Sequence, residues 1–385
     1  MKVLTGMRRS GKSTLMRMVM DELATMGRSR DNMIYISFEE GKNAHLKSWE
    51  PLYNHIIEMA SGIDGRVYIF IDELQEVDEW QLCIRALMVD IDSDIYITGS
   101  SSKMLSGEMA THIAGRYIEI GVRPFSFAEV VEFEKQRGSG LTTKELFEKY
   151  RVMGGMPYII KNGLDVDDAR SYISSTFDSV VIRDICIRKA VRKTELLDDI
   201  IRYATSEIGH AISSINITNY LKSQKRSASV DTVLDYMGYA VEARYMDKVF
   251  RQDLKGKSLL KTDYRYYLTD VGFREALNLD NGAAVDQILE NLVYNELVVR
   301  GYRVTIGRTA GDHEIDFVAD RNGKREYYQV SYLMSTEETR KREFGAFSDV
   351  PDNYPKYVLS MDEIDMSRDG IVHRNIVDWL AEGPR

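Results

Sequence analysis

Short apolar runs alternate with amphipathic helical patterns over the first third of the chain. The runs are nearly continuous in apolar residues, as in strands buried on both faces of a parallel sheet; they lie at 2–5, 32–38, 66–71, 94–98 and 117–120. The segments between them repeat their apolar residues at helical spacing, at 15–23, 49–60 and 79–87. Strands that alternate with helices predict an α/β fold with a parallel sheet.

The pattern changes twice in the middle of the chain. Residues 129–200 are almost entirely helical in pattern, which predicts a helical lid. Two short helices are then expected at 217–222 and 230–240, followed by alternating strands at 244–252 and 265–269. Two helices joined by a polar turn and followed by a hairpin predict a winged helix.

The last hundred residues read as another α/β unit. A helix is expected at 287–300, and strands at 314–319 and 326–331 flank an Asn-Gly hairpin signal. A helix with acidic residues followed by these strands resembles the restriction-endonuclease and Holliday-junction-resolvase fold. That resemblance implies a metal site built from Asp316 and either Glu290 or Glu296, together with a lysine. Gln329 and Ser331 stand at the final positions of the motif, so we expect a module that has lost its nuclease chemistry.

These patterns divide the chain into four expected regions. They are a parallel α/β core at 1–128, a lid at 129–200, a winged helix at 201–275 and a small restriction-endonuclease-like α/β domain at 276–385.

Composition narrows the class of protein. The 385 residues are 44% hydrophobic and 29% charged, which is typical of a soluble globular chain, and no apolar run approaches the roughly twenty residues that span a bilayer. The net charge of −9 argues against nucleic-acid binding by the whole surface. Cys83 and Cys186 fit no metal or redox spacing. We expect a cytoplasmic protein without a signal peptide.

A phosphate-binding signature follows the first expected strand. The sequence from Gly6 to Ser13 fills every fixed position of G-x-x-x-x-G-K-[ST], between a strand and a helix. Glycines let the backbone wrap a phosphate, and the helix N-terminus supplies partial positive charge. Lys12 is expected to reach the β- and γ-phosphates, and Ser13 to hold Mg²⁺. The alternative is an ordinary glycine-rich turn. The candidate ATP-binding residues of the loop are Gly6, Met7, Arg8, Arg9, Ser10, Gly11, Lys12, Ser13 and Thr14.

Polar residues end two further strands of the same expected sheet. Asp72 and Glu73 close an apolar run, at the sheet edge where open α/β sheets bind ligands. Asp72 is a candidate Mg²⁺ ligand and Glu73 a candidate base that polarises the attacking water; the alternative is a solvated turn. Ser100, in a Gly-Ser turn after the next strand, either senses the γ-phosphate or belongs to a simple turn.

Together these segments resemble the AAA+ ATPases, and more narrowly a prokaryotic group close to the archaeal and origin-recognition-type ATPases. The matching segments are Gly6–Ser13, Ile71–Glu73, Thr98–Ser101, Gly115–Arg116, Pro124–Phe127 and, in the tail, Gln329–Tyr332. Gly154-Gly155-Met156-Pro157 resembles the element by which the lid of that lineage approaches the nucleotide. The resemblance implies that Arg116 is the arginine finger and that Pro157 lies near the nucleotide.

The basic residues of the expected winged helix suggest a partner. They outnumber the acidic residues between 216 and 267, which phosphate binding would require, although winged helices also dock proteins. The basic positions are Lys222, Lys225, Arg226, Arg244, Lys248, Arg251, Lys255, Lys257, Lys261 and Arg265.

The sequence thus predicts an ATP- and Mg²⁺-dependent AAA+-type ATPase that couples its nucleotide state to DNA or a protein. The winged helix is the expected DNA site, the C-terminal domain an expected protein-docking module, and a homo-oligomer is expected for an arginine finger acting between subunits. Two alternatives remain open, namely a slow nucleotide-dependent binding switch or scaffold, and an ATP-gated nuclease.

Overall fold

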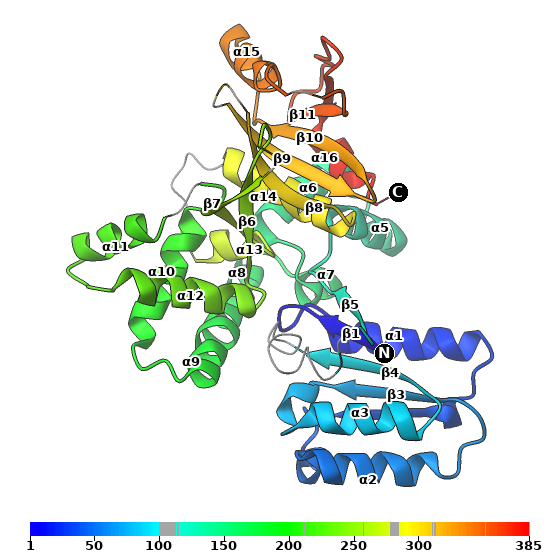
Figure 1. Ribbon diagram of the computed structural model, residues 1–385. Helices are drawn as coiled ribbons and strands as arrows, with labels where there is room; N and C mark the ends of the chain where they lie inside the picture. The colour runs from blue at the N-terminus through cyan, green and yellow to red at the C-terminus, as the bar shows by residue number, and fades with distance from the viewer. Residues whose placement is uncertain are drawn as a thin grey trace. The chain divides into compact units, whose positions relative to one another are not determined.

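The computed structural model (Figure 1) describes residues 1–99, 113, 115–210, 213–256, 258–277, 285–309, 311, 313–350 and 352–384. The chain forms two compact units. The first comprises Met1–Arg123 with Glu242–Arg244, and the second comprises Pro124–Val241 with Tyr245–Arg385.

A five-stranded, fully parallel sheet forms the first unit, in the order β2-β3-β4-β1-β5. Its strands are β1 (Lys2–Thr5), β2 (Met33–Ser37), β3 (Val67–Asp72), β4 (Ser93–Gly99) and β5 (Ile118–Gly121). Its helices are α1 (Lys12–Thr25), α2 (Trp49–Ala60) and α3 (Trp80–Asp90), with short 3-10 turns η1 (Arg30–Asn32), η2 (Gly41–Leu46) and η3 (Leu74–Glu76). The predicted parallel α/β sheet is confirmed.

Strand β3 shows why these strands read as unbroken apolar runs. Val67, Ile69 and Ile71 share one core cluster with residues of α2 and α3, whereas Tyr68 and Phe70 lie in another with Met16 of α1. Helices therefore cover both faces of the sheet (Figure 1), and neither face can carry polar side chains at low cost.

Helices begin the second unit, as the sequence predicts for residues 129–200. They are α5 (Phe127–Arg137), α6 (Thr143–Met153), α7 (Pro157–Asn162), α8 (Val166–Thr176), α9 (Asp184–Lys189) and α10 (Thr194–Ser206), with a π-helical segment η5 (Phe177–Arg183). Reciprocal capping boxes start two of them: Ser126 with Glu129 at α5, and Thr142 with Glu145 at α6.

The next two helices and hairpin also occur where expected, as α11 (Ser214–Ser223), α12 (Val230–Glu242), β6 (Met246–Asp253) and β7 (Ser258–Leu268). The remaining elements are α13 (Gly272–Ala276), α14 (Val285–Val299), β8 (Arg303–Arg308), β9 (Glu314–Arg321), β10 (Lys324–Val330), α15 (Glu337–Gly345), β11 (Lys356–Ser360), β12 (Val372–Asn375) and α16 (Ile376–Ala381).

One seven-stranded sheet runs across the expected boundary at residue 275. Its order is β12-β11-β10-β9-β8-β6-β7, because β6 pairs with β7 on one side and, in parallel, with β8 on the other. A two-stranded hairpin is marginally stable alone, and pairing with β8 covers one of its open edges. Val249 of β6 and Tyr267 of β7 share a core cluster with Leu289 of α14, and Phe147 of α6 joins the same cluster. The helical segment, the hairpin and the C-terminal strands thus have a common core.

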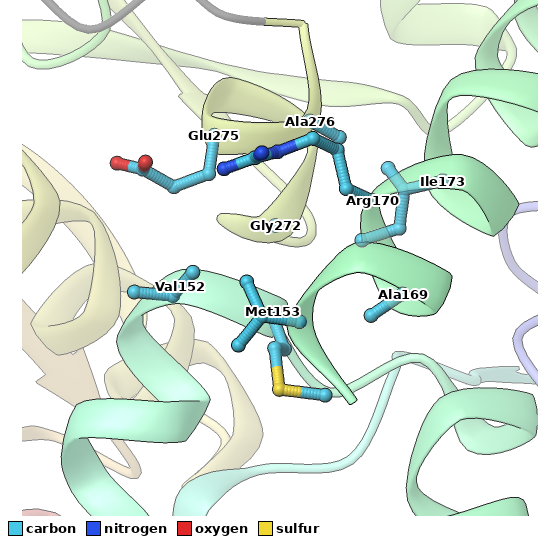
Figure 2. Close-up of a pocket in the computed structure, with 9 residues that line it drawn as sticks. Val152, Met153, Ala169, Arg170, Ile173, Gly272, Glu275 and Ala276 are labelled. Atoms are coloured by element: carbon cyan, nitrogen blue, oxygen red, sulfur yellow. The ribbon is translucent and has the colours of Figure 1, made fainter. Parts of the chain in front are cut away.

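A small cavity marks where α6, α8 and α13 meet (Figure 2). Its volume of about 10 Å³ is at the lower limit for one water molecule. Val152 and Met153 of α6, Ala169 and Ile173 of α8, and Gly272 of α13 are among the residues that line it. The three helices are therefore closely packed.

Candidate functional site

The loop between β1 and α1 is shaped by its two glycines. Gly6 has a φ of +156°, and a Cβ there would lie 2.1 Å from the carbonyl oxygen of Val122. Gly11 precedes α1 in the left-handed conformation, at φ 97°. Any other residue at Gly6 would push the loop away from the neighbouring backbone, so the signature glycine has a direct steric reason.

Lys12 is the first residue of α1 and lies on the inner side of this loop. Its side chain is buried, with 4% exposed, and its Nζ donates to the carbonyl oxygens of Gly6, at 3.1 Å, and Met7, at 3.0 Å. Buried Ser10 Oγ has no hydrogen-bond partner among the described residues. Within the described chain, α1 has neither a capping side chain nor an acidic residue in its first turn. The loop thus offers an ammonium group, an unpaired hydroxyl and a positive helix end, which together suit an anion such as a nucleotide phosphate.

Two carboxylates end strand β3. Asp72 is 1% exposed and accepts hydrogen bonds from the hydroxyls of Thr98 and, at 3.3 Å, Tyr35. Glu73 is 8% exposed and adopts the left-handed conformation, with φ 55°. Its carboxylate accepts a hydrogen bond from the Gln75 amide.

Thr98 of β4 links the Asp72 carboxylate to the backbone of Glu73. Its hydroxyl donates to Asp72 and accepts the backbone N–H of Glu73 at 2.9 Å. Sequence reasoning did not identify Thr98 as a site residue. The sequence feature that could have indicated it is a polar residue at the end of an apolar strand. That feature points to the site only once β4 is known to lie between β1 and β3.

Strand order brings the loop and the carboxylates to one edge of the sheet. Thr5, the last residue of β1, pairs with Gly99 of β4, and Ile71 of β3 pairs with Ile97 of the same strand. Because all these strands are parallel, the phosphate-type loop and the Asp72-Glu73 pair follow the carboxyl ends of β1 and β3, the two strands that flank β4, where such sheets bind ligands. Ser13, half-buried in the first turn of α1, and Asp72 both carry oxygen atoms, the kind of ligand that Mg²⁺ prefers.

The three other candidate site residues, Ser100, Arg116 and Pro157, lie in different parts of the chain. Ser100 lies outside the described residues. Arg116 is exposed in a turn before β5, where Gly115 has φ 73° and the N–H of Arg116 donates to the carbonyl of Ile113 at 3.1 Å. Pro157 is the first residue of α7 and belongs to the second unit.

A buried carboxylate fixes the turn before Pro157. Asp270 accepts the backbone N–H groups of Gly155 and Gly272, each at 2.8 Å, and a Cβ on Gly154 would lie 1.8 Å from its Oδ1. Burial raises the pKa of Asp270 to about 6, and the two hydrogen bonds limit that rise. The Gly-Gly turn is therefore held by a residue far along the chain.

Several basic residues of the expected winged helix make ion pairs. Arg226 pairs with Asp199 at 2.5 Å, Arg244 with Glu119 at 2.7 Å, and Arg251 with Glu314. Lys222, Lys225 and Lys255 are exposed, whereas Lys257 lies outside the described residues. Partial neutralisation leaves less free positive charge than the sequence count indicated.

Arg265 lies among the acidic residues of the C-terminal sheet. Its guanidinium pairs with Glu290 at 2.7 Å and with Glu314, and Glu290 also accepts from the Tyr267 hydroxyl. Burial raises the pKa of Glu290 and that of Asp316, and Arg265 opposes both shifts.

The other candidate positions of this module are also engaged. Asp316 accepts the N–H of Val330 at 2.8 Å, and Gln329 accepts the N–H of Asp316 at 3.2 Å. Glu296 pairs with Arg300 at 2.7 Å. Among the described residues, no group of three or more His, Cys, Asp or Glu side chains is arranged to hold a metal ion.

Comparisons with known proteins agree with this geometry at the first unit. Residues 1–131 match a protein family described as an AAA domain, and residues 144–283 match a domain of unknown function. An uncharacterized protein of Haemophilus influenzae is 33% identical over 384 residues, covering 99% of this chain and 94% of its own. An uncharacterized protein of Methanocaldococcus jannaschii is 28% identical, covering 90% and 77% respectively.

Among solved structures, a Walker-type ATPase of Pyrococcus abyssi is similar with 16% identity and a TM-score of 0.49, covering 72% of this chain and 90% of its own. In the described part of the chain, no helix has both the length and the apolar character needed to cross a bilayer.

Proposed function

We propose that this chain, which belongs to the same family as the Haemophilus influenzae protein, is a Mg²⁺-dependent ATPase that couples its nucleotide state to a macromolecular partner. Residues 1–131 are an AAA-type P-loop core by their family match. The observation that carries the proposal is that the Lys12 loop and the Asp72-Glu73 pair follow the carboxyl ends of β1 and β3, the two strands that flank β4 in one parallel sheet.

Each residue of the site has a distinct role in this proposal. Lys12, with the backbone N–H groups of the loop, would bind and orient the phosphates of ATP. Ser13 and Asp72 would hold Mg²⁺, which when bound neutralises charge on the phosphates. Glu73 would polarise the attacking water. Thr98 would position Glu73 by holding its backbone N–H.

Removal of the Lys12 ammonium tests the phosphate site. We expect Lys12→Ala to weaken ATP binding about 10- to 100-fold, because a charge-assisted hydrogen bond contributes about 1.5–3 kcal/mol. Calorimetric titration with ATP and Mg²⁺ measures this. Lys42→Ala is the matched control, since Lys42 is 76% exposed on η2. Unchanged affinity in Lys12→Ala, with an unchanged melting temperature, would refute the nucleotide site.

Arg116 is proposed to complete the active site of a neighbouring subunit. It precedes β5, which forms one edge of the five-stranded sheet, and it is exposed there. An arginine supplied to phosphoryl transfer can raise the rate by about 10³–10⁵. We therefore expect Arg116→Ala and Lys12→Ala to be inactive separately and to regain ATPase activity when mixed, because one supplies an intact loop and the other an intact arginine.

The mixing experiment also identifies the opposite arrangement. Arg30→Ala, at an exposed arginine paired with Asp21, serves as a control for loss of surface charge. If the mixture stays inactive while Arg116→Ala alone is inactive, the arginine acts within its own subunit.

DNA is the partner that we propose for the α11–α12 helices and the β6–β7 hairpin. Exposed Lys222 and Lys225 lie at the end of α11 and in the following turn, whereas Arg226 is held by Asp199. Each lost phosphate contact should flatten the log–log dependence of affinity on salt by about 0.9 for duplex DNA. We expect Lys222→Ala with Lys225→Ala to flatten it by about twice that amount, and Lys341→Ala on α15 to leave it unchanged. A double variant that binds like the parent would instead favour protein docking at this surface.

A further inference from the structure

A cavity of about 450 Å³ lies in the C-terminal part of the second unit. Arg300, just beyond the end of α14, is on its wall, ten residues after Glu290 and therefore about 15 Å further along the helix direction. The cavity is thus separate from the Arg265 cluster, and it belongs to a different unit from the Lys12 loop.

The lining of this cavity is positively charged, although the chain as a whole is acidic. Four cationic side chains and two carboxylates line it, a formal charge of +2 against −9 for the chain; they are Arg300, Arg321, Lys324 and Arg374, with Glu326 and Glu382. Arg374 pairs with Glu382, and Arg300 pairs with Glu296 of α14 at 2.7 Å, so the positive charge without an ion pair among the described residues lies at Arg321 and Lys324. Such a concave positive surface attracts anions.

Two of these cations stand directly opposite each other across a tight turn. Arg321 of β9 pairs in register with Lys324 of β10, around the Asn322-Gly323 hairpin. Like charges at directly opposed positions destabilise a sheet. The next pair in the ladder, Asp320 with Arg325, is complementary, with an ion pair at 2.8 Å. Lys324 is exposed and makes no ion pair within the described part of the chain. An anionic ligand would relieve the repulsion between Arg321 and Lys324.

Aromatic rings form the rest of the wall. Tyr328 of β10 stacks on Tyr357 of β11 with ring centroids 5.0 Å apart, and the Arg300 guanidinium lies 3.9 Å from the ring centre of Trp379. Tyr328 and Trp379 are buried beneath, while Tyr302 and Tyr357 are half-buried at the cavity surface. The hydroxyls of Tyr302 and Tyr328 both donate to the Glu326 carboxylate, at 3.0 and 2.5 Å. These bonds orient Glu326, whose remaining lone pairs can accept from an amino group.

We infer that this cavity binds a nucleoside phosphate, with the base against Tyr357 or Tyr302 and the phosphate at Arg321 and Lys324. A cationic surface beside aromatic faces is the arrangement that holds nucleotides through stacking and charge. An acidic peptide would use the cations and leave the aromatic wall without a partner. The nucleoside phosphate has two sources, a free mononucleotide or one unit of a single-stranded nucleic acid.

The test uses two probes that share a base. Deoxyadenosine monophosphate is titrated by calorimetry, and a fluorescein-labelled oligodeoxyadenylate by fluorescence anisotropy. Both are measured in full-length Lys12→Ala protein, so that the loop after β1 contributes little. Tyr357→Leu is expected to weaken binding about 5- to 100-fold, the range for losing one base-stacking contact. Arg321→Ala with Lys324→Ala is expected to weaken it by at least about tenfold and to lower its salt dependence.

Controls separate this site from a general loss of fold. Lys341→Ala, at an exposed position on α15, should leave both affinities unchanged. Lys324→Ala alone, at an exposed position, replaces the double variant if the latter melts early. Loss with both probes, or with one of them, supports the inference and identifies the source. Three results would overturn the inference. The first is that neither probe binds, and the second is that none of the cavity variants changes the affinity. The third is that oligoglutamate displaces the labelled strand at the same concentration as unlabelled oligodeoxyadenylate.

Discussion

Replacing Glu73 by Gln is expected to lower ATP turnover about 10²- to 10⁴-fold while ATP still binds. The range is the usual loss when one positioned general base is removed. Glutamine has the same shape, and the backbone bond from residue 73 to Thr98 does not depend on the side chain, so the end of β3 should stay in place. Steady-state ATPase rates and ATP titration together separate turnover from binding.

Glu76→Gln is the matched control for this change. Glu76 lies three residues further on, in η3, is 47% exposed and pairs with Lys47 at the surface. It should turn over ATP like the parent. A Glu73→Gln protein with parental turnover would remove Glu73 from the mechanism, and we would then look for the water-polarising group elsewhere at this sheet edge.

Replacing Arg265 by Met is expected to lower the free energy of unfolding by about 3–5 kcal/mol, the usual cost of breaking a buried ion pair by removing one partner. Glu290 and Asp316 would remain buried without their cation, and each already has a raised pKa. The folded state therefore takes up protons on these groups more readily than the unfolded chain does. The variant should regain stability as the pH falls, because protonation removes the buried charge.

Chemical denaturation of the parent and Arg265→Met at pH 8 and pH 5.5 measures this. Arg30→Met is the control, since Arg30 pairs with Asp21 and both side chains are more than 60% exposed. Adding Glu290→Gln to Arg265→Met should restore part of the stability at pH 8. Equal stability of Arg265→Met and the parent at pH 8 would mean that the acidic residues have another counter-charge.

How much the sequence predicts depends on how local each feature is. The loop from Gly6 to Ser13 is one contiguous segment, and so is the Asp72-Glu73 pair. Local spacing alone therefore predicts the loop, the first turn of α1 and the end of β3. Thr98 makes its contacts with Asp72 and Glu73 only because β4 lies between β1 and β3. The order of strands in a sheet cannot be predicted from any short segment of the sequence.

Charge was the harder property to predict in the C-terminal half. Counting residues placed Arg265 in a basic, DNA-facing group, yet its side chain is buried against Glu290 from a helix that starts twenty residues later. Asp270 gave no signal at all, since its partners, Gly155 and Gly272, are backbone groups. The role of such residues depends on which distant parts of the chain bury them. The order of residues along the sequence does not give those contacts.

The strands of the second sheet are spread over more than a hundred residues of the chain, which affects folding during synthesis on the ribosome. The first sheet has all its strands once residue 121 has emerged, whereas the second sheet waits for β12 at residues 372–375. At the usual pace of translation this gap is roughly 10 to 50 seconds. For a few seconds of that interval, β6 and β7 are present without β8, and the edge of β6 is open to pairing with other nascent chains. We expect codon usage or chaperone contact between residues 268 and 308 to affect the yield of soluble protein more than the same changes before residue 121.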